Sequence, residues 1–303
     1  MHTRAGPEAL VYEEAPVPEP NEGDALIRVR AAGITPTEFT WSSTFRTKDK
    51  KDRLPVIPGF EVAGTVERAQ EGSGLSKGDQ VYGLLDFWRD GSAAEYVAAR
   101  ASDMAPCPGS LDFIQAAAIP LSGLTAWQGL FDHAEVSQGD RVLVHGAGGG
   151  VGSYALQLAR WKGAHVIATC SATKADLVRE LGADEVIDYA RTRFEEEVGG
   201  VDAVLDTVGG ETLERSWGVI RKGGTLVTIV DDAPEAKATG YGVRGVSMLV
   251  EPSRSQLNEI ARLVDQGKVR PIVKGVFPLS DARTAYEKGL SGHNTGKTVL
   301  KVP

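Results

Sequence analysis

A run of glycines, Gly146 to Gly152 with the sequence GAGGGVG, has the residue types and spacing that could bind the phosphates of a dinucleotide. The segment Arg141 to His145 precedes the run and predicts a strand, and residues 153–161, SYALQLARW, follow it and predict a helix. Glycines in this setting let the backbone approach a pyrophosphate without a Cβ, and the start of the helix offers free N–H groups to an anion. We therefore interpret the run as a pyrophosphate-binding loop.

The match of this run to the pattern G-x-G-x-x-G is imperfect. With Gly149 and Gly152 as the second and third glycines, the first position holds Ala147. A bare glycine run is as often a plain loop or a linker, but the flanking strand and helix favour a dinucleotide site. The helical spacing predicts that four residues share the buried side of the helix: Ala155, Leu158, Ala159 and Trp161.

The residues after the next strand bear on the choice between NADH and NADPH. An NAD enzyme usually places an acid there, about 20 residues past the glycines, to bind the ribose 2′-hydroxyl. Here the segment reads ATCSATK, with Ser171 and Lys174 where the acid would stand. A hydroxyl and an ammonium attract a 2′-phosphate that a carboxylate would repel. We predict NADPH as the cofactor; the alternative is that Lys174 is a surface charge near a helix start.

Composition sets limits on location and partners. The chain of 303 residues is long enough for two domains, and its net charge of −8 argues against nucleic acid as a partner. It shows neither an apolar run of membrane-spanning length nor the apolar centre of a signal peptide, so we expect a cytoplasmic protein that acts on a small molecule away from membranes. Two cysteines, Cys107 and Cys170, are too few for a disulfide framework or a cysteine-based zinc site.

The segments that must position these residues predict two kinds of domain. Short strands with frequent turns before residue 110 predict a compact, mostly antiparallel β unit. After that point strands alternate with helices, which predicts an α/β, Rossmann-type doubly wound parallel sheet. The closing segments do not continue the alternation and should return to the first domain. We predict one discontinuous domain over 1–110 and 268–303, and the nucleotide-binding domain over 111–267.

Eight segments, in their order along the chain, resemble conserved blocks of the zinc-independent medium-chain dehydrogenase/reductase superfamily, in its quinone oxidoreductase or ζ-crystallin branch. They are AAGITPTEF, PVIPGFEVAGTV, GDQVYG, AAIPLSGLTAW, GAGGGVGSYALQLA, LGADEVIDY, VLDTVGGETL and GKTVLKV. The resemblance implies a GroES-like, mostly β catalytic domain beside the Rossmann domain. It also implies hydride transfer from NADPH to a quinone or an α,β-unsaturated carbonyl, and a homodimer that pairs through residues 244–250, RGVSMLV.

The resemblance also implies which residues contact the cofactor. They are Thr125, Gly149, Gly150, Val151, Gly152, Ser171, Lys174, Tyr189, Thr207, Val208, Val230 and Asp231. For Thr125 and the last four, a simple turn or packing role is the alternative.

The positions that hold a cysteine and a histidine in the alcohol dehydrogenase branch resemble Thr35 and Phe60 here, so we expect no catalytic metal. Thr35 is the candidate donor to a substrate carbonyl oxygen, with a turn position before Pro36 as its alternative. We assign no proton donor and expect solvent to protonate the product. The five histidines show no ligand spacing: His2, His133, His145, His165 and His293. Four aromatic residues could line an apolar pocket for a planar substrate, or belong to the domain core: Trp41, Phe45, Phe87 and Trp88.

Two other functions stay open at this point. The first is an enoyl-thioester reductase of a biosynthetic pathway, whose large substrate would require a basic rim; the loop Lys48 to Arg53, KDKKDR, is the candidate for one. The second is a non-catalytic NADPH-binding protein, which would bind the cofactor without oxidising it.

Overall fold

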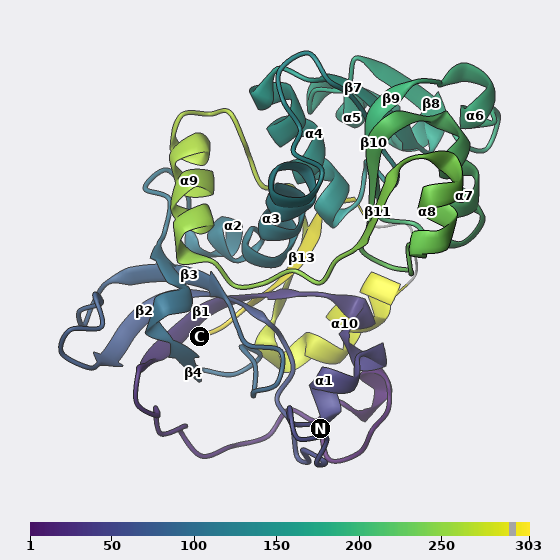
Figure 1. The fold of residues 1–303 in the computed structure, drawn as a ribbon. Coiled ribbons are helices and arrows are strands. Elements are labelled where there is room, and N and C mark those ends of the chain that lie inside the picture. Colours follow the sequence, from purple (N-terminus) through teal and green to yellow (C-terminus); the bar gives the residue numbers. More distant parts are fainter. Residues whose placement is uncertain (291–294) are drawn as a thin grey trace. The chain divides into compact units, whose positions relative to one another are not determined.

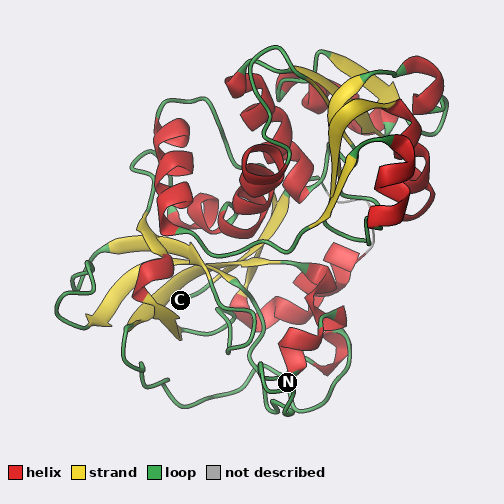
Figure 2. Cartoon of the chain, viewed as in Figure 1, coloured by secondary structure: helices red, strands yellow, loops and turns green. Residues whose placement is uncertain are grey.

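The computed structural model describes residues 1–290 and 295–303 and divides into two compact units (Figure 1). Unit 1 comprises Met1–Leu121, Glu251–Gly267 and Pro271–Pro303, and unit 2 comprises Ser122–Val250 and Lys268–Arg270. Most of the strands of unit 1 follow one another along the chain, whereas strands and helices alternate in unit 2 (Figure 2). Among the described residues, none of the helices has both the length and the apolar character needed to cross a membrane.

Unit 2 is built on a six-stranded sheet with the order β11-β10-β9-β6-β7-β8, in which every pairing is parallel. The strands are β6 (Arg141–Val144), β7 (His165–Cys170), β8 (Glu185–Asp188), β9 (Val201–Asp206), β10 (Ile220–Thr228) and β11 (Arg244–Ser247). Successive strands are added outward from β6, first on one side and then on the other. This is the doubly wound order of a nucleotide-binding sheet, so the predicted Rossmann-type fold is confirmed.

Helices cover both faces of this sheet. Helix α4 (Gly150–Lys162) connects β6 to β7, and α5 (Ala175–Glu180) connects β7 to β8. Figure 1 shows α7 (Gly210–Ser216) and α8 (Glu235–Tyr241) on the face opposite α4. Leu213 of α7 and Ala238 of α8 pack in one core cluster with Leu143 of β6, whereas α6 (Phe194–Glu197) contributes Phe194. Apolar strands buried between two layers of helices account for the short hydrophobic runs in the sequence.

One residue of α4 differs from the predicted buried side. Ala155, Leu158 and Ala159 are buried as predicted, but Trp161 is 36% exposed. Its ring stacks on Trp127, with centroids 6.0 Å apart and an angle of 28° between the planes. Trp161 lies in the last turn of α4, which ends at Lys162, and its ring packs on this neighbouring aromatic ring.

Unit 1 is built on a seven-stranded, mostly antiparallel sheet with the order β12-β13-β1-β2-β3-β5, in which β4 also pairs with β1. The strands are β1 (Asp24–Ile34), β2 (Glu61–Ala69), β3 (Gln80–Leu84), β4 (Tyr96–Arg100), β5 (Met104–Pro106), β12 (Val273–Pro278) and β13 (Lys297–Lys301). The helices are α1 (Ser42–Phe45), α2 (Phe113–Ala117), α9 (Arg254–Asp265) and α10 (Ala282–Leu290); α3 (Pro120–Trp127) begins at the end of unit 1 and continues into unit 2.

The limits of the two units differ from the domain limits predicted from the sequence. The first limit lies after Leu121 instead of residue 110, and residues 251–267 belong to unit 1 instead of the nucleotide-binding unit. Helix α9 is held in unit 1 by its packing and by a hydrogen bond of 2.7 Å from the Tyr82 hydroxyl to the carbonyl of Leu257. An amphipathic pattern predicts a helix but does not identify the surface on which the helix packs, which explains the difference.

Candidate functional site

The glycine loop leads directly from β6 into α4, and two of its glycines have no room for a side chain. Gly146 has a φ of +69°, and a Cβ there would lie 2.3 Å from Thr207 Oγ1. A Cβ at Gly152 would lie 2.4 Å from the carbonyl oxygen of Gly146. Ala147, the residue that departs from the motif, is fully buried, and its N–H donates to the Thr169 carbonyl at 3.1 Å. Gly146 therefore takes the tight-turn role of the first motif glycine.

The loop presents the N-terminus of a helix of 13 residues. Gly149 is the N-cap of α4, and the first backbone bond into the helix runs from the Ser153 N–H to the Gly149 carbonyl at 3.1 Å. The N–H groups of Gly150, Val151 and Gly152 belong to the first turn, where no intrahelical acceptor exists. Together with the helix dipole, they form a cradle that fits a pyrophosphate.

Ser171 and Tyr189 follow the ends of two neighbouring strands in unit 2. β7 and β8 are paired with Cys170 opposite Asp188, so the residues that come next leave the sheet side by side. The Tyr189 N–H donates to the Cys170 carbonyl at 3.3 Å, and the Tyr189 ring is exposed. Ser171 Oγ lies 3.0 Å from Thr173 Oγ1. The structure thus brings together the two residues predicted for the adenosine end of the cofactor.

Lys174 lies directly on the glycine loop. A Cβ added to Gly148 would come within 2.5 Å of Lys174 Cδ, so the methylene chain of the lysine packs over that glycine. This contact places the side chain of Lys174 against the glycine loop. Sequence reasoning missed a second cation, Arg191, whose Nε is 3.6 Å from Asp188 Oδ2. Its signal was the arginine two residues after Tyr189.

The turn after β9 is held by side chains of the strand itself. Thr207 Oγ1 donates to the His145 carbonyl at 2.8 Å, and the N–H groups of Val208 and Gly209 both donate to the carboxylate of Asp206 at 3.1 Å. The Val208 side chain is half-exposed. The turn is therefore rigid and presents an apolar side chain to its surroundings.

The turn after β10 lies against the turn after β9, because a Cβ at Gly209 would be 3.0 Å from Val230 Cγ2. Val230 is half-exposed as well. The Asp231 carboxylate accepts N–H groups from Asp232 at 2.9 Å and Gly210 at 3.1 Å, and these hydrogen bonds lower its pKa. Asp231 therefore fixes the turn. Thr125, another residue predicted to contact the cofactor, is buried on α3.

His145 is a buried structural residue of unit 2. Its Nδ1 lies 2.9 Å from Thr169 Oγ1 and its Nε2 lies 3.0 Å from Ser216 Oγ. Burial lowers the pKa of His145 to about 3, so the ring is neutral at physiological pH.

In unit 1, the end of β1 meets the beginnings of β2 and β13, because β1 is antiparallel to both. Gly33 is opposite Glu61 in one pairing and opposite Val299 in the other. Thr35, the residue after β1, therefore lies near the first residues of the two neighbouring strands. Lys297 Nζ donates to Thr35 Oγ1 at 3.3 Å and forms an ion pair with the buried carboxylate of Glu61.

Sequence reasoning identified Thr35 but missed this network. The glutamate of the block PGFEVAG and the lysine of the block GKTVLKV were its signals, as charged residues at the start of apolar strands. A third acid, Glu38, is also fully buried, and its carboxylate accepts hydrogen bonds from the Tyr286 hydroxyl and from the Gly59 N–H at 3.0 Å. Burial raises the pKa of Glu38 to about 7.

Phe60, at the position that resembles a zinc ligand, belongs to a cluster of aromatic rings. Its ring stacks on Trp41 at a centroid distance of 5.9 Å and lies edge-on to Phe87 at 4.9 Å. Within residues 1–290 and 295–303, no group of three or more His, Cys, Asp or Glu side chains could hold a metal ion. His293 lies outside the described residues. The absence of a catalytic metal stays a prediction, which metal analysis can test.

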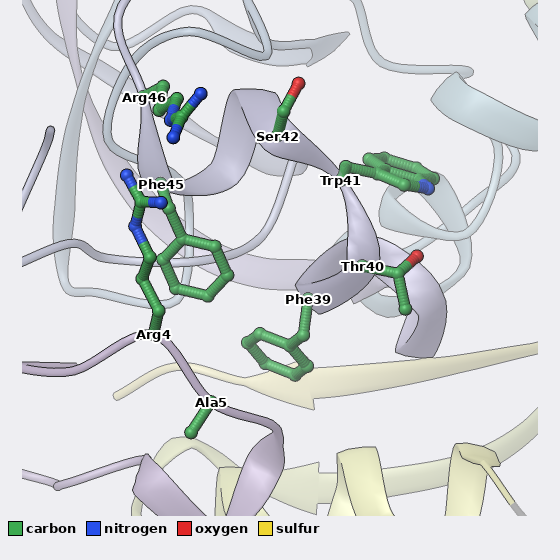
Figure 3. Close-up of a pocket in the computed structure, with 8 residues that line it drawn as sticks. All are labelled: Arg4, Ala5, Phe39, Thr40, Trp41, Ser42, Phe45 and Arg46. Carbon is green, nitrogen blue, oxygen red and sulfur yellow. The ribbon is translucent and has the colours of Figure 1, made fainter. Parts of the chain in front are cut away.

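The four aromatic residues predicted for a substrate pocket lie in different surroundings. Trp41 and Phe45 line a pocket of about 330 Å³ in unit 1, together with Phe39, Arg4 and Arg46. Figure 3 shows the rings of Phe39 and Phe45 near one another, whereas the indole of Trp41 extends away from them.

The remaining two residues do not line this pocket. Phe87 packs in the cluster with Trp41 and Phe60. Trp88 is half-buried, and its backbone N–H donates to Asp86 Oδ1 at 3.0 Å. Phe45 is also buried against Met1 and Val56. The structure therefore places Trp41 beside Phe45 at the pocket and beside Phe87 in the aromatic cluster. Trp88 belongs neither to the residues that line this pocket nor to that cluster.

Comparison with known proteins agrees with this arrangement. The alcohol dehydrogenase GroES-like domain family matches residues 21–109, and the zinc-binding dehydrogenase family matches residues 181–300. A probable mitochondrial zinc-binding oxidoreductase of Arthroderma benhamiae is 36% identical, over 97% of this chain and 93% of the relative. The chain belongs to the medium-chain dehydrogenase/reductase family. Within that family it is of the quinone oxidoreductase-like type, as the following relatives indicate.

A chloroplastic NADPH-dependent alkenal/one oxidoreductase of Arabidopsis thaliana is 36% identical, over 94% of this chain and 73% of the relative. The structure of a quinone oxidoreductase from Coxiella burnetii superposes with a TM-score of 0.90 and 32% identity, over 99% of this chain and 96% of that one. This medium-chain dehydrogenase/reductase is thus an oxidoreductase that uses a nicotinamide cofactor. The predicted family and fold class, including the GroES-like domain, are confirmed.

Proposed function

We propose that this oxidoreductase uses NADPH, without a catalytic metal, to reduce a quinone or an α,β-unsaturated carbonyl compound. The observation that carries the proposal is the position of Lys174 on the glycine loop, with Ser171 instead of an acid after β7. An ammonium group and a hydroxyl beside the pyrophosphate cradle suit a 2′-phosphate. The Arabidopsis relative, named as NADPH-dependent and active on alkenals and alkenones, supports the same cofactor and substrate class.

Each part of the binding site has a distinct task in this proposal. The first-turn N–H groups of α4 hold the pyrophosphate, and Ser171, Lys174 and Arg191 hold the 2′-phosphate. The bound cofactor supplies a hydride from C4 of its nicotinamide ring. Val208 and Val230 give the turns after β9 and β10 an apolar surface that excludes water.

Thr35 is the proposed donor to the substrate. Reduction of the carbon–carbon double bond of an enone places negative charge on the carbonyl oxygen, and a hydroxyl that donates to this oxygen lowers the barrier. Thr35 is the N-cap residue of the 3₁₀ helix Pro36–Thr40, but within the described part of the chain its side chain makes no capping hydrogen bond. The hydroxyl is therefore not committed to a turn, which favours the donor role over the turn alternative. Solvent then protonates the carbon.

The charges of the loop Lys48 to Arg53 favour a quinone or enone over a thioester substrate. Lys48 Nζ is 3.6 Å from Asp86 Oδ2, and Arg53 is 3.3 Å from Asp90 Oδ1. Because acidic groups already neutralise part of this loop, it offers little excess positive charge to the phosphates of a CoA or carrier-protein thioester.

We also propose a homodimer that pairs through residues 244–250. Strand β11 is at the edge of the unit 2 sheet, where one row of backbone groups is open to a further strand. A cytoplasmic location stays a prediction, since the Arthroderma and Arabidopsis relatives are named as mitochondrial and chloroplastic.

The test is to follow NADPH absorbance with a panel of quinones, enones and enoyl-CoA thioesters, with NADH in parallel and with metal analysis of the purified protein. We expect quinones or enones to be reduced, with kcat/KM at least about tenfold higher for NADPH, the equivalent of about 1.4 kcal/mol. Equal use of NADH contradicts the cofactor assignment. Turnover of thioesters alone identifies the thioester reductase, NADPH binding without turnover identifies the non-catalytic protein, and stoichiometric zinc contradicts the metal-free mechanism.

A further inference from the structure

Lys297 is a buried lysine whose ammonium group has three partners. The residue is 6% exposed. Its Nζ donates to the Ile34 carbonyl at 3.0 Å and to Thr35 Oγ1 at 3.3 Å, and it forms an ion pair with Glu61. Two of the three N–H donors of the ammonium group serve these hydrogen bonds, and the ion pair holds the group against Glu61.

Glu61 supplies the countercharge that lets an ammonium group remain in the interior. Its side chain is fully buried, and its Oε1 accepts the N–H of Leu121 at 3.0 Å. Glu61 thus has a backbone partner for one carboxylate oxygen and Lys297 for the other. A buried pair of this kind adds little net stability but holds its charges in a defined position.

The contact between Lys297 and Thr35 determines what the threonine hydroxyl can do. An oxygen that accepts an N–H from Lys297 keeps its own proton for an acceptor in another direction. Thr35 is half-buried, so this acceptor can come from outside the core. The ammonium behind the oxygen polarises the O–H bond and strengthens its hydrogen bond to a developing negative charge.

We propose that Lys297 is a positioning residue for the reduction: it orients and polarises the Thr35 hydroxyl toward the substrate carbonyl oxygen. The inference rests on the proposed role of Thr35 as donor. Because negative charge on that oxygen grows only as hydride is transferred, the contribution of Lys297 is larger in the transition state than in the bound substrate. Loss of Lys297 should therefore lower kcat and leave KM nearly unchanged.

The test is a double-mutant cycle between Thr35→Val and the charge-neutral pair Glu61→Gln with Lys297→Met. Removing both charges together avoids leaving a buried carboxylate without its ammonium partner. We expect Thr35→Val to lower kcat on the order of 10²-fold, as for the loss of one oxyanion donor. The neutral pair should lower kcat about tenfold in the wild-type background, and by less than about twofold in the Thr35→Val background.

Lys301→Met is the matched control, since Lys301 is on the same strand but exposed, and it should leave kcat within about twofold. Lys297→Arg in the wild-type background should retain more activity than the neutral pair, because the charge is kept. NADPH affinity and the thermal midpoint of each variant report whether the fold is intact.

Two results would overturn the role of Lys297. The first is that the neutral pair lowers kcat by the same factor in the wild-type and Thr35→Val backgrounds, because additive losses mean that the two sites act independently. The second is a loss confined to KM. Absence of turnover by the wild-type protein overturns the proposed function itself.

Discussion

Glu38 and His145 are buried ionisable side chains whose shifted pKa values act on stability in opposite directions. Burial raises the pKa of Glu38 to about 7 and lowers the pKa of His145 to about 3. The unfolded chain protonates His145 below its ordinary value of 6.5 while the folded protein does not, so this residue lowers stability as pH falls from about 6.5 to about 3. Glu38 lowers stability in the other direction, as pH rises from its ordinary pKa of 4.5 to about 7.

Glu38→Gln should isolate the contribution of this carboxyl group. Between the ordinary pKa of 4.5 and the folded value of about 7, the unfolded chain has lost the proton that the folded protein keeps. The free energy of unfolding therefore falls as pH rises through this window, by at most about 3 kcal/mol, and the glutamine variant does not share the fall. Urea denaturation at about pH 4.5 and about pH 8 should show the stability of the variant rising relative to that of the wild type; a constant difference would show that folding does not raise the pKa of Glu38.

Lys174→Ala should separate the two nicotinamide cofactors. Loss of one charge-assisted hydrogen bond costs roughly 1.5–3 kcal/mol, so NADPH affinity should fall about 10- to 150-fold, while NADH affinity changes by less than about twofold. Fluorescence titration of the two cofactors measures this. Lys222→Ala is the control. Lys222 is exposed near the start of β10, whereas the glycine loop follows the carboxyl end of the parallel strand β6, so the two lie at opposite ends of the strands. Unchanged NADPH affinity in Lys174→Ala contradicts the 2′-phosphate site.

At the scale of elements, β1 pairs with β2, β4 and β13 of unit 1, and Gly33 lies where β1 approaches α2 and the side chain of Glu61 closely. A Cβ at this position would lie 2.3 Å from the Ala117 carbonyl of α2 and 2.9 Å from Glu61 Oε2. The end of β1, the start of β2 with its buried ion pair, and α2 are thus packed without space for one methyl group.

Gly33→Ala should destabilise the protein by about 1–3 kcal/mol, because the added methyl group displaces backbone or the Glu61 side chain. The matched control is Gly240→Ala on α8, where an added Cβ meets no described atom within 4 Å. That exposed helical position should gain up to about 1 kcal/mol. Thermal or denaturant unfolding of both variants provides the measurement, and equal stabilities would show that β1 moves away from α2 without loss of free energy.

Helices and strands with a clear hydrophobic periodicity were predictable from the sequence, but the residues on which they pack were not. The alternation of strands and helices around GAGGGVG predicted the parallel sheet of unit 2, because short-range pattern determines strand and helix type. Helix α9 was assigned to the wrong unit, since its packing depends on the distant residue Tyr82. Thr35 stays a prediction that rests on its sequence block. Its partner Lys297 is 262 residues away, and the pairing of β1 with β13 brings the two residues together.

At the scale of the whole molecule, the proposed dimer predicts the state of the protein in solution. One chain has a mass of 32.2 kDa, so light scattering should give about twice that value if residues 244–250 pair across a two-fold axis. Leu249→Glu should weaken the dimer at least about tenfold, because Leu249 is 69% exposed in this segment and burial of an unpaired carboxylate is strongly unfavourable. Val11→Glu, at another exposed apolar residue, should leave the mass unchanged. A monomer in the wild type contradicts the dimer.

The division of unit 1 into separate stretches of chain has a consequence for synthesis. Its strands β1 to β5 emerge before unit 2, and β12 and β13 emerge after it. At roughly 5–20 residues per second, the 33 residues from Pro271 to Pro303 take about 2–7 s after unit 2 has left the ribosome's active centre. During that interval residues 31–34 of β1 have an open edge, and Glu61 has not yet met Lys297. The nascent chain therefore passes through a stage in which unit 2 can be complete while unit 1 still has an unpaired strand edge and a carboxylate without its ammonium partner.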